Sequence, residues 1–216
     1  MTGTKSDILS KLNKYKIFIG IGIAVAISIA SGMITFVKAK SRKEETAWQS
    51  MWRINNDLAK ASQTGKTEKD KNEALNTAIE AFEYIKEISA SSGIMPWVLF
   101  QMGNIYYELK KYDEAIRIYN DFLQRHRGHP IAFLVSQSLG YAYEEKGLLQ
   151  EAGNQFNDTL LSNKVFLVAQ QGWDAGRCYD KLGQKENAIR NYTKAVDSDP
   201  DSIWASLSRY RLSIIK

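Results

Sequence analysis

Few side chains in this sequence could do chemistry. His126 and His129 lie in a basic stretch, Arg125-His126-Arg127-Gly128-His129, and Cys178 is the only cysteine. Two histidines without a neighbouring cysteine or carboxylate make a poor zinc site, so we interpret the stretch as a solvated turn or a weak anion contact. We expect Cys178 to be a small buried residue with an unreactive thiol.

The arrangements that catalysis requires are missing from the sequence. It has no glycine-rich phosphate loop, no Ser/His/Asp or Cys/His nucleophile arrangement, and no carboxylate pair in an apolar setting. We therefore predict no catalytic residue, no metal site and no cofactor, and we expect that the protein is not an enzyme.

The net charge of +5 is concentrated at one end of the chain. Residues 1–43 contain eight lysines and arginines and only one acidic residue, Asp7, whereas residues 44–216 contain 21 basic and 23 acidic residues. A protein that binds nucleic acid needs its positive charge on the folded domain. The distribution therefore argues against a nucleic-acid partner.

The positive charge flanks an apolar segment, Ile17–Val37, in which 21 consecutive residues carry no charge. A helix rises about 1.5 Å per residue, so this segment can cross a hydrocarbon layer of about 30 Å. We predict a basic tail over 1–16 and a transmembrane helix over 17–38. A signal peptide cleaved near Ala30 is the alternative, but the apolar run continues past that site. Lysines and arginines are balanced on the two sides, so the orientation stays open.

Residues 39–72 are predicted to form a juxtamembrane helix and a polar loop. The helix covers 44–62 and carries Trp48 and Trp52, which either lie at the lipid interface or pack on the first repeat. The loop covers 63–72, a stretch rich in charges that also contains Gly65.

A four-residue pattern recurs three times in the second half of the sequence. A glycine is followed by a tyrosine after three residues, an alanine after nine more and an aromatic residue after another four, and the copies lie 37 and 36 residues apart. The sets are Gly103, Tyr106, Ala115, Tyr119; Gly140, Tyr143, Ala152, Phe156; and Gly176, Tyr179, Ala188, Tyr192. A fixed period of this length predicts stacked helical hairpins.

The repeat pattern sets the predicted domain organisation. Ala78 and Phe82 lie 37 residues before Ala115 and Tyr119, which indicates a partial repeat before the first full one. The solenoid covers 73–216, with a partial repeat over 73–95, repeats over 96–132, 133–168 and 169–202, and a terminal helix over 203–216. We expect Asp199 to cap that last helix. The fold class is all-α, with an N-terminal transmembrane helix followed by a helical-hairpin solenoid.

The repeats resemble those of the tetratricopeptide repeat family. The third copy has Gly176, Tyr179, Ala188, Tyr192, Ala195 and Pro200 in the family's register. The resemblance implies that the first helix of each hairpin lines a concave groove that binds a protein segment. The positions that it assigns to the groove, here called the groove candidates, are Trp97, Phe100, Asn104, Tyr107, Leu134, Gln137, Tyr141, Trp173 and Arg177.

The groove candidates favour one mode of binding over another. Of the Lys, Asn and Arg residues in the family's clamp for a terminal carboxylate, the first unit has Asn104 alone, so we predict no clamp. The aromatic and amide side chains instead suit an extended or helical segment with apolar anchors. Alternatively, Trp97 or Phe100 packs on the partial first repeat.

The layout as a whole is similar to that of the bacterial YfgM-type ancillary subunit of the Sec translocon. This likeness implies a single-pass inner-membrane protein with a periplasmic C-terminal domain and with translocon or chaperone partners. We predict a membrane-tethered scaffold or adaptor that binds a protein segment to support assembly, export or chaperoning of a membrane-associated complex. The alternatives are a permanent structural subunit of a larger complex and a secreted scaffold released by signal cleavage. The partner's identity and the oligomeric state stay open.

Overall fold

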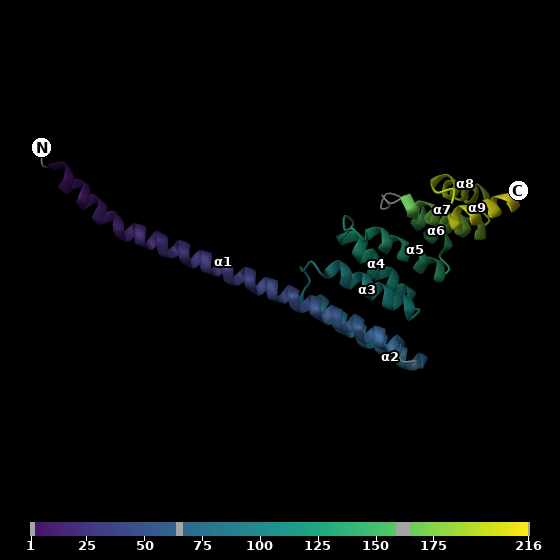
Figure 1. Ribbon diagram of the computed structural model, residues 1–216, viewed down its shortest axis with the longest axis horizontal. Coiled ribbons are helices and arrows are strands. Elements are labelled where there is room, and N and C mark those ends of the chain that lie inside the picture. The colour runs from purple at the N-terminus through teal and green to yellow at the C-terminus, as the bar shows by residue number, and fades with distance from the viewer. Residues whose placement is uncertain (1–2, 64–66, 159–164, 216) are drawn as a thin grey trace. The chain divides into compact units, whose positions relative to one another are not determined.

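The computed structural model describes the backbone of residues 3–63, 67–158 and 165–215, and it describes side chains in these ranges from Ser28 onward, except for 165–166. The chain divides into two compact units, residues 1–49 and 50–216, which are described separately. All the regular secondary structure in the described ranges is helical (Figure 1). An all-α fold is therefore confirmed for this part of the chain.

The first unit belongs to a single long helix, α1 (Gly3–Gln63), whose last turns belong to the second unit. The backbone of the predicted transmembrane segment 17–38 lies within α1, but the side chains up to residue 27 lie outside the described part. Among the residues whose side chains are described, no helix is long and apolar enough to span a bilayer. The described end of the apolar segment, including Met33 and Phe36, is exposed in the isolated chain.

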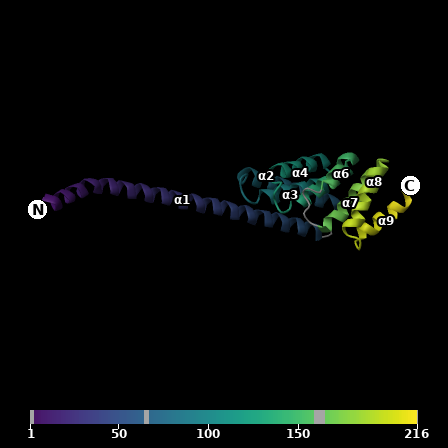
Figure 2. The same cartoon turned by 90° about the horizontal axis from the view of Figure 1, so that it is seen from above.

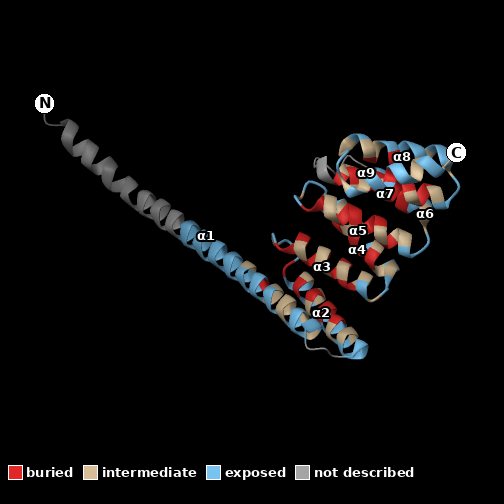
Figure 3. Cartoon of the chain, turned by 45° about the vertical axis from the view of Figure 1, so that its right-hand side comes forward, coloured by how far each residue is buried: buried red, intermediate tan, exposed pale blue. Residues whose placement is uncertain are grey.

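The second unit continues with eight further helices in the described ranges (Figure 2). They are α2 (Glu68–Ile88), α3 (Met95–Glu108), α4 (Tyr112–Arg125), α5 (Ala132–Glu145), α6 (Leu149–Asn157), α7 (Val165–Lys181), α8 (Lys185–Ser198) and α9 (Ile203–Ile214). The pairs α3/α4, α5/α6 and α7/α8 are the three predicted hairpins. Buried residues lie mainly on the sides of these helices that face one another (Figure 3).

Each hairpin is closed by one glycine against one aromatic ring. A methyl group added at Gly103 would lie 2.3 Å from Tyr119, one at Gly140 would lie 2.4 Å from Phe156, and one at Gly176 would lie 2.5 Å from Tyr192. These separations are far below van der Waals contact, so only glycine lets the ring lie against the first helix. The constant offset of 16 residues between glycine and ring thus fixes how closely the two helices of a hairpin approach.

The tyrosine of the repeat pattern contacts the preceding hairpin in the second and third repeats. Tyr179 on α7 packs its ring on Gly153 of α6, where an added methyl group would lie 3.0 Å from it, and its hydroxyl donates to Asn154 Oδ1 over 2.9 Å. Tyr143 on α5 accepts a hydrogen bond of 3.4 Å from Asn120 on α4. One aromatic position therefore closes each hairpin, and in the second and third hairpins another joins the hairpin to the preceding one.

The turns inside the hairpins share one backbone geometry. Lys110, Gly147 and Gly183 occupy the same place in the three turns and have φ angles of 58°, 80° and 71°. The next amide in each turn bonds back to the carbonyl five residues earlier, as Leu148 does to Tyr143 over 2.9 Å. Glycine adopts this left-handed conformation without penalty, whereas Lys110 does so at a cost of about 1 kcal/mol.

One helix start and one helix cap differ from the predictions made from sequence. α2 begins at Glu68 rather than Glu73, so the polar loop is shorter than 63–72. The reason is a capping box, in which Thr67 Oγ1 accepts from the Asp70 amide over 3.3 Å and Asp70 Oδ2 accepts from the Thr67 amide over 3.1 Å. α9 is capped by Ser202, whose Oγ accepts from the Ala205 amide over 3.1 Å, and the expectation for Asp199 was wrong.

Candidate functional site

The structure places all nine groove candidates on the first helices α3, α5 and α7, where Gln137 is buried and the other eight are half-buried. They do not form one continuous site. Asn104 lines a pocket, while Gln137, Tyr141 and Arg177 belong to a polar network. Trp97, Tyr107 and Trp173 make contacts between aromatic rings, and Phe100 and Leu134 lie half-buried on α3 and α5.

The pocket lies where the last turns of α1, the first turns of α2 and the C-terminal half of α3 meet, and its volume is about 310 Å³. Its lining is apolar on one side and polar on the other, and consists of Leu58, Ala59, Ala61, Ser62, Lys71, Ala74, Leu75, Gln101, Asn104, Ile105 and Glu108. The polar side carries two amides and one ion pair. Such a mixture can hold an apolar side chain and orient the polar backbone beside it.

Hydrogen bonds hold the polar side of this pocket in place. Asn104 Oδ1 accepts from the Tyr119 hydroxyl over 2.7 Å, and Gln101 Nε2 donates to Asn55 Oδ1 over 3.4 Å. Lys71 Nζ lies 2.7 Å from Glu108 Oε1. The hydrogen bond to Glu108 and the charge of that residue raise the pKa of Lys71. The ion pair is partly exposed, so a bound segment could exchange contacts with it at little cost.

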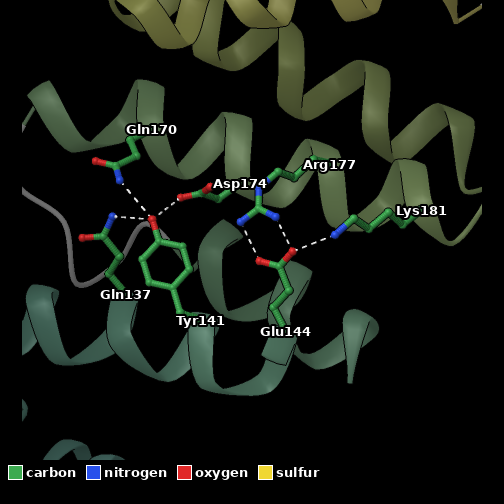
Figure 4. Close-up of polar contacts among 7 residues, drawn as sticks. All are labelled: Gln137, Tyr141, Glu144, Gln170, Asp174, Arg177 and Lys181. Carbon is green, nitrogen blue, oxygen red and sulfur yellow. Dashed lines mark hydrogen bonds and ion pairs between the residues drawn. The ribbon is translucent and has the colours of Figure 1, made fainter. Parts of the chain in front are cut away.

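The polar network joins α5 to α7 and is centred on Tyr141 (Figure 4). The Tyr141 hydroxyl donates to Asp174 Oδ2 over 2.7 Å and accepts from Gln170 Nε2 over 3.0 Å and from Gln137 Nε2 over 3.4 Å. Burial, followed by the charge of Asp174, raises the pKa of Tyr141. The hydroxyl therefore stays protonated and works as a structural link between hairpins.

A cluster of charges continues the network along the same face (Figure 4). Arg177 donates to Asp174 Oδ1 over 3.1 Å and makes a two-pronged contact with Glu144, in which Nη2 lies 2.5 Å from Oε2. Lys181 Nζ lies 2.9 Å from Glu144 Oε1. The groove candidates Gln137, Tyr141 and Arg177 therefore belong to a network that joins the second hairpin to the third.

The pKa values of Glu144 and Asp174, the two carboxylates of the network, are shifted in opposite directions, so their contributions to stability depend on pH in opposite ways. Burial would raise the pKa of Glu144, but the hydrogen bonds and charges of Arg177 and Lys181 outweigh it and lower the pKa. Glu144 therefore stabilises the fold above its ordinary pKa, and that contribution is lost as the pH falls through the lowered value. Burial raises the pKa of Asp174 although Tyr141 and Arg177 oppose it, so Asp174 favours folding more as the pH falls.

Asp174 is the member of this network that sequence reasoning missed. It is only 3% exposed and accepts hydrogen bonds from both Tyr141 and Arg177. The available signal was its position three residues before Arg177, a spacing that places the two side chains on the same face of a helix.

The basic stretch at residues 125–129 ends α4 and enters the turn that we expected, with Arg125, Arg127 and Gly128 exposed, but its two histidines are half-buried. His129 packs edge-to-face against Trp97 at 5.6 Å between ring centroids and against Phe122 at 6.0 Å, and His126 packs against Phe122 at 5.6 Å. Burial, followed by the charges of His129 and Arg125, lowers the pKa of His126. Trp97 thus contacts the turn after its own hairpin. No group of three or more potential metal ligands occurs among the described residues.

Tyr107, Trp173 and Cys178 pack within the solenoid. Tyr107 packs edge-to-face on Tyr112 at 5.5 Å, and Trp173 packs on Tyr192 at 5.4 Å. Cys178 is buried, as expected, and burial raises the pKa of its thiol to about 12. A thiol with so high a pKa is a poor nucleophile at neutral pH.

Family models for the tetratricopeptide repeat match two stretches of the sequence, residues 97–129 and 173–202. These are the first and third hairpins. The chain contains tetratricopeptide repeats. The hairpin between them carries the same glycine and ring, Gly140 and Phe156, at the repeat spacing.

Solved structures show the same fold. A tetratricopeptide repeat protein from Parabacteroides merdae has a TM-score of 0.59 and 20% identity over 77% of this chain and 60% of its own. MamA from Desulfovibrio magneticus RS-1 has a TM-score of 0.56 and 19% identity over 77% of this chain and 83% of its own. YrrB, described as having an unusual peptide-binding site, has a TM-score of 0.52 and 16% identity over 83% of this chain and 88% of its own.

A curated relative shares part of the sequence. The human protein O-mannosyl-transferase TMTC2 is 25% identical over 118 residues, which are 55% of this chain and only 14% of the human protein. The similarity therefore concerns a small portion of that enzyme.

We predict that Tyr141→Phe lowers the free energy of unfolding by about 1–3 kcal/mol, because it leaves the buried Asp174 carboxylate without one of its two donors. Thermal unfolding of the full chain in detergent, followed by circular dichroism, measures the change. Tyr143→Phe is the matched control, since that hydroxyl has a longer hydrogen bond to an exposed asparagine. Equal shifts in the two variants would show that the network does not hold the hairpins together.

Proposed function

We propose that this protein is a membrane-tethered scaffold whose tetratricopeptide repeats bind a segment of a partner protein, and so support the assembly, export or chaperoning of a membrane-associated complex. The repeats and their fold suit peptide or protein binding. The observation that carries the proposal is the pocket between α1, α2 and α3, which contains the groove candidate Asn104.

The chemistry of the pocket suggests what it binds. Leu58, Leu75 and Ile105 supply an apolar side, and a volume of about 310 Å³ suits one or two apolar side chains of a segment. Gln101 and Asn104 supply amides, which can bond to the backbone of an extended chain. The site therefore favours an apolar anchor within a segment over a terminal carboxylate.

The pocket and the network occupy different parts of the predicted groove, and we propose a different role for each. Around Tyr141 and Arg177, side chains that could have contacted a ligand are bonded to one another. Breaking those contacts for a ligand would leave buried charges without partners, which costs several kcal/mol. We propose that binding concentrates at the pocket, and that the α5–α7 face holds the solenoid rigid.

Filling the pocket tests the binding site. A photo-crosslinker at Ser62, on the pocket lining, should capture one dominant partner in cells, and Ala74→Phe should reduce that yield by roughly fivefold or more because the ring occupies the space of the anchor. Ala90→Phe, at an exposed position outside the lining, is the matched control. A crosslinker at the exposed Arg117 on α4 sets the background. Equal yields from Ser62 in both phenylalanine variants would rule out the pocket.

We also propose that residues 17–38 anchor the chain as a single membrane span with the repeats on the extracytoplasmic side, as in the YfgM-type layout. Support comes from the run of 21 uncharged residues and from the flanking positive charge. The backbone over this run is helical, as a span requires. Residues 44–216 carry a slight negative charge, which suits protein partners better than nucleic acid.

We propose that the protein binds its partner without catalysis. Around the α5–α7 face, Asp174, Arg177 and Glu144 are paired with one another, and they hold hairpins together rather than present a reactive group. The stretch shared with the human transferase covers 14% of that enzyme, so the likeness carries no activity to this chain.

Membrane extraction tests the anchor. The full chain should stay in the membrane fraction at alkaline pH, whereas a variant with Ala24→Lys and Ile27→Lys should be released, because two charges in the apolar layer cost about 5–7 kcal/mol together. Thr46→Lys with Gln49→Lys adds the same charge at exposed positions and should not be released. Protease protection of a C-terminal tag in sealed vesicles of both orientations then assigns the side. Release of the unaltered chain would contradict the anchor.

A further inference from the structure

The pocket between α1, α2 and α3 has one wall that is packed differently from the other two. Residues 50–63 of α1, here called the α1 wall, contribute Leu58, Ala59, Ala61 and Ser62 to the lining. All residues of the α1 wall are described, and none of them is fully buried. By contrast, α3 and α5 each bury seven residues. The α1 wall is therefore the least buried part of the pocket.

The walls that α2 and α3 supply are held in place. Lys71 Nζ on α2 lies 2.7 Å from Glu108 Oε1 on α3, and Lys111 Nζ in the turn after α3 donates to Asn76 Oδ1 on α2 over 3.2 Å. The residues that α2 buries are Leu75, Ala78, Ile79, Phe82 and Ile85. Since buried apolar area resists local opening, these two walls keep their positions when the pocket is filled.

The α1 wall is attached more weakly. Its side-chain hydrogen bond to α3, from Gln101 Nε2 to Asn55 Oδ1, is 3.4 Å long, which is beyond the usual range for a strong bond. Its apolar residues Met51, Ile54 and Leu58 are only half-buried. A helix with few buried apolar contacts and partly exposed hydrogen bonds is the part of a fold that moves most easily.

A place at the end of the solenoid does not by itself leave a helix weakly attached, as α9 shows. α9 buries two residues, and Arg211 Nε lies 3.0 Å from Asp180 Oδ2 on α7. This ion pair repeats the one between Arg177 on α7 and Glu144 on α5, so α9 packs on α7 as α7 packs on α5. The weak attachment is thus specific to the end of the solenoid that carries the pocket.

We infer that the α1 wall is a movable side of the pocket, which closes on the apolar anchor of a bound segment while α2 and α3 stay in place. The inference rests on the function proposed for the pocket. Leu58 is the largest apolar side chain that α1 contributes to the lining, and Leu75 and Ile105 lie on the other walls. An anchor between these side chains supplies the apolar contacts that the α1 wall lacks in the free chain.

A movable wall determines which segments the pocket accepts. A pocket with fixed walls favours one anchor size, because a larger side chain forces its neighbours out of their preferred positions and a smaller one leaves a cavity. A wall that adjusts its position accepts anchors of different volumes with little difference in affinity. The site therefore takes protein segments whose apolar anchor varies in size, such as leucine in one partner and phenylalanine in another.

Distances between spin labels test the movement without a partner. In the full chain with Cys178→Ala, in detergent, one pair of labels is attached at Lys60→Cys and Arg117→Cys, and a reference pair at Glu80→Cys and Arg117→Cys, all exposed positions. The α1 pair should give a distance distribution roughly twice as broad as that of the reference pair. Ala74→Leu and Ala74→Phe, which build an anchor into the pocket from α2, should each narrow the α1 pair to the reference width.

Two variants show whether the narrowing comes from the pocket. Ala90→Phe, at an exposed position outside the lining, should leave the α1 pair broad. Leu58→Ser combined with Ala74→Phe should restore the broad distribution, because it removes the contact on the α1 side. Equal widths of the two pairs in the unaltered chain, a broad α1 pair in both Ala74 variants, or narrowing by Ala90→Phe would each overturn the inference. Crosslinking from Ser62 tests separately whether the pocket binds a partner, so a fixed wall would leave the proposed function standing.

Discussion

The contact between one glycine and one aromatic ring determines how closely the helices of each hairpin pack. At Gly103, Gly140 and Gly176 the ring lies where a side chain would otherwise be, so the second helix is held against the first at a separation that no other residue allows. Because all three hairpins have the same internal geometry, successive first helices present equivalent positions to one another. The network between α5 and α7 and the ion pair between α7 and α9 both depend on this regularity.

Polar contacts then divide the face formed by the first helices into three regions. At the α1–α3 end, amides and a partly exposed ion pair surround a pocket. In the middle, Tyr141, Asp174 and Arg177 bond to one another and bring hairpins two and three together. At the far end, α9 repeats the first-helix packing but has no second helix over it among the described residues. The structure thus places a pocket at the α1–α3 end of this face and a set of mutual side-chain contacts in its middle.

Sequence spacing predicted the hairpins because the glycine, alanine and ring recur at fixed intervals that the packing demands. It did not predict the network, since the family's groove positions do not show that Tyr141 and Arg177 would satisfy each other through Asp174. The turn at residues 125–129 was predicted, but the packing of its two histidines on the rings of Trp97 and Phe122 was not, because spacing does not show which rings a turn residue reaches. The early start of α2 was missed because the capping pair, Thr67 and Asp70, lies within a charged stretch that suggested a loop.

The most direct test of the central contact is a double-mutant cycle at Gly140 and Phe156, measured as the free energy of unfolding of the full chain. Gly140→Ala alone should destabilise the fold by about 1–3 kcal/mol, since the methyl group meets the ring. In a Phe156→Ala background the same change should cost nothing or stabilise by up to about 1 kcal/mol, because alanine favours helix more than glycine does. Gly128→Ala, with nothing within 4 Å, should have little effect. An equal cost of Gly140→Ala in both backgrounds would contradict this account.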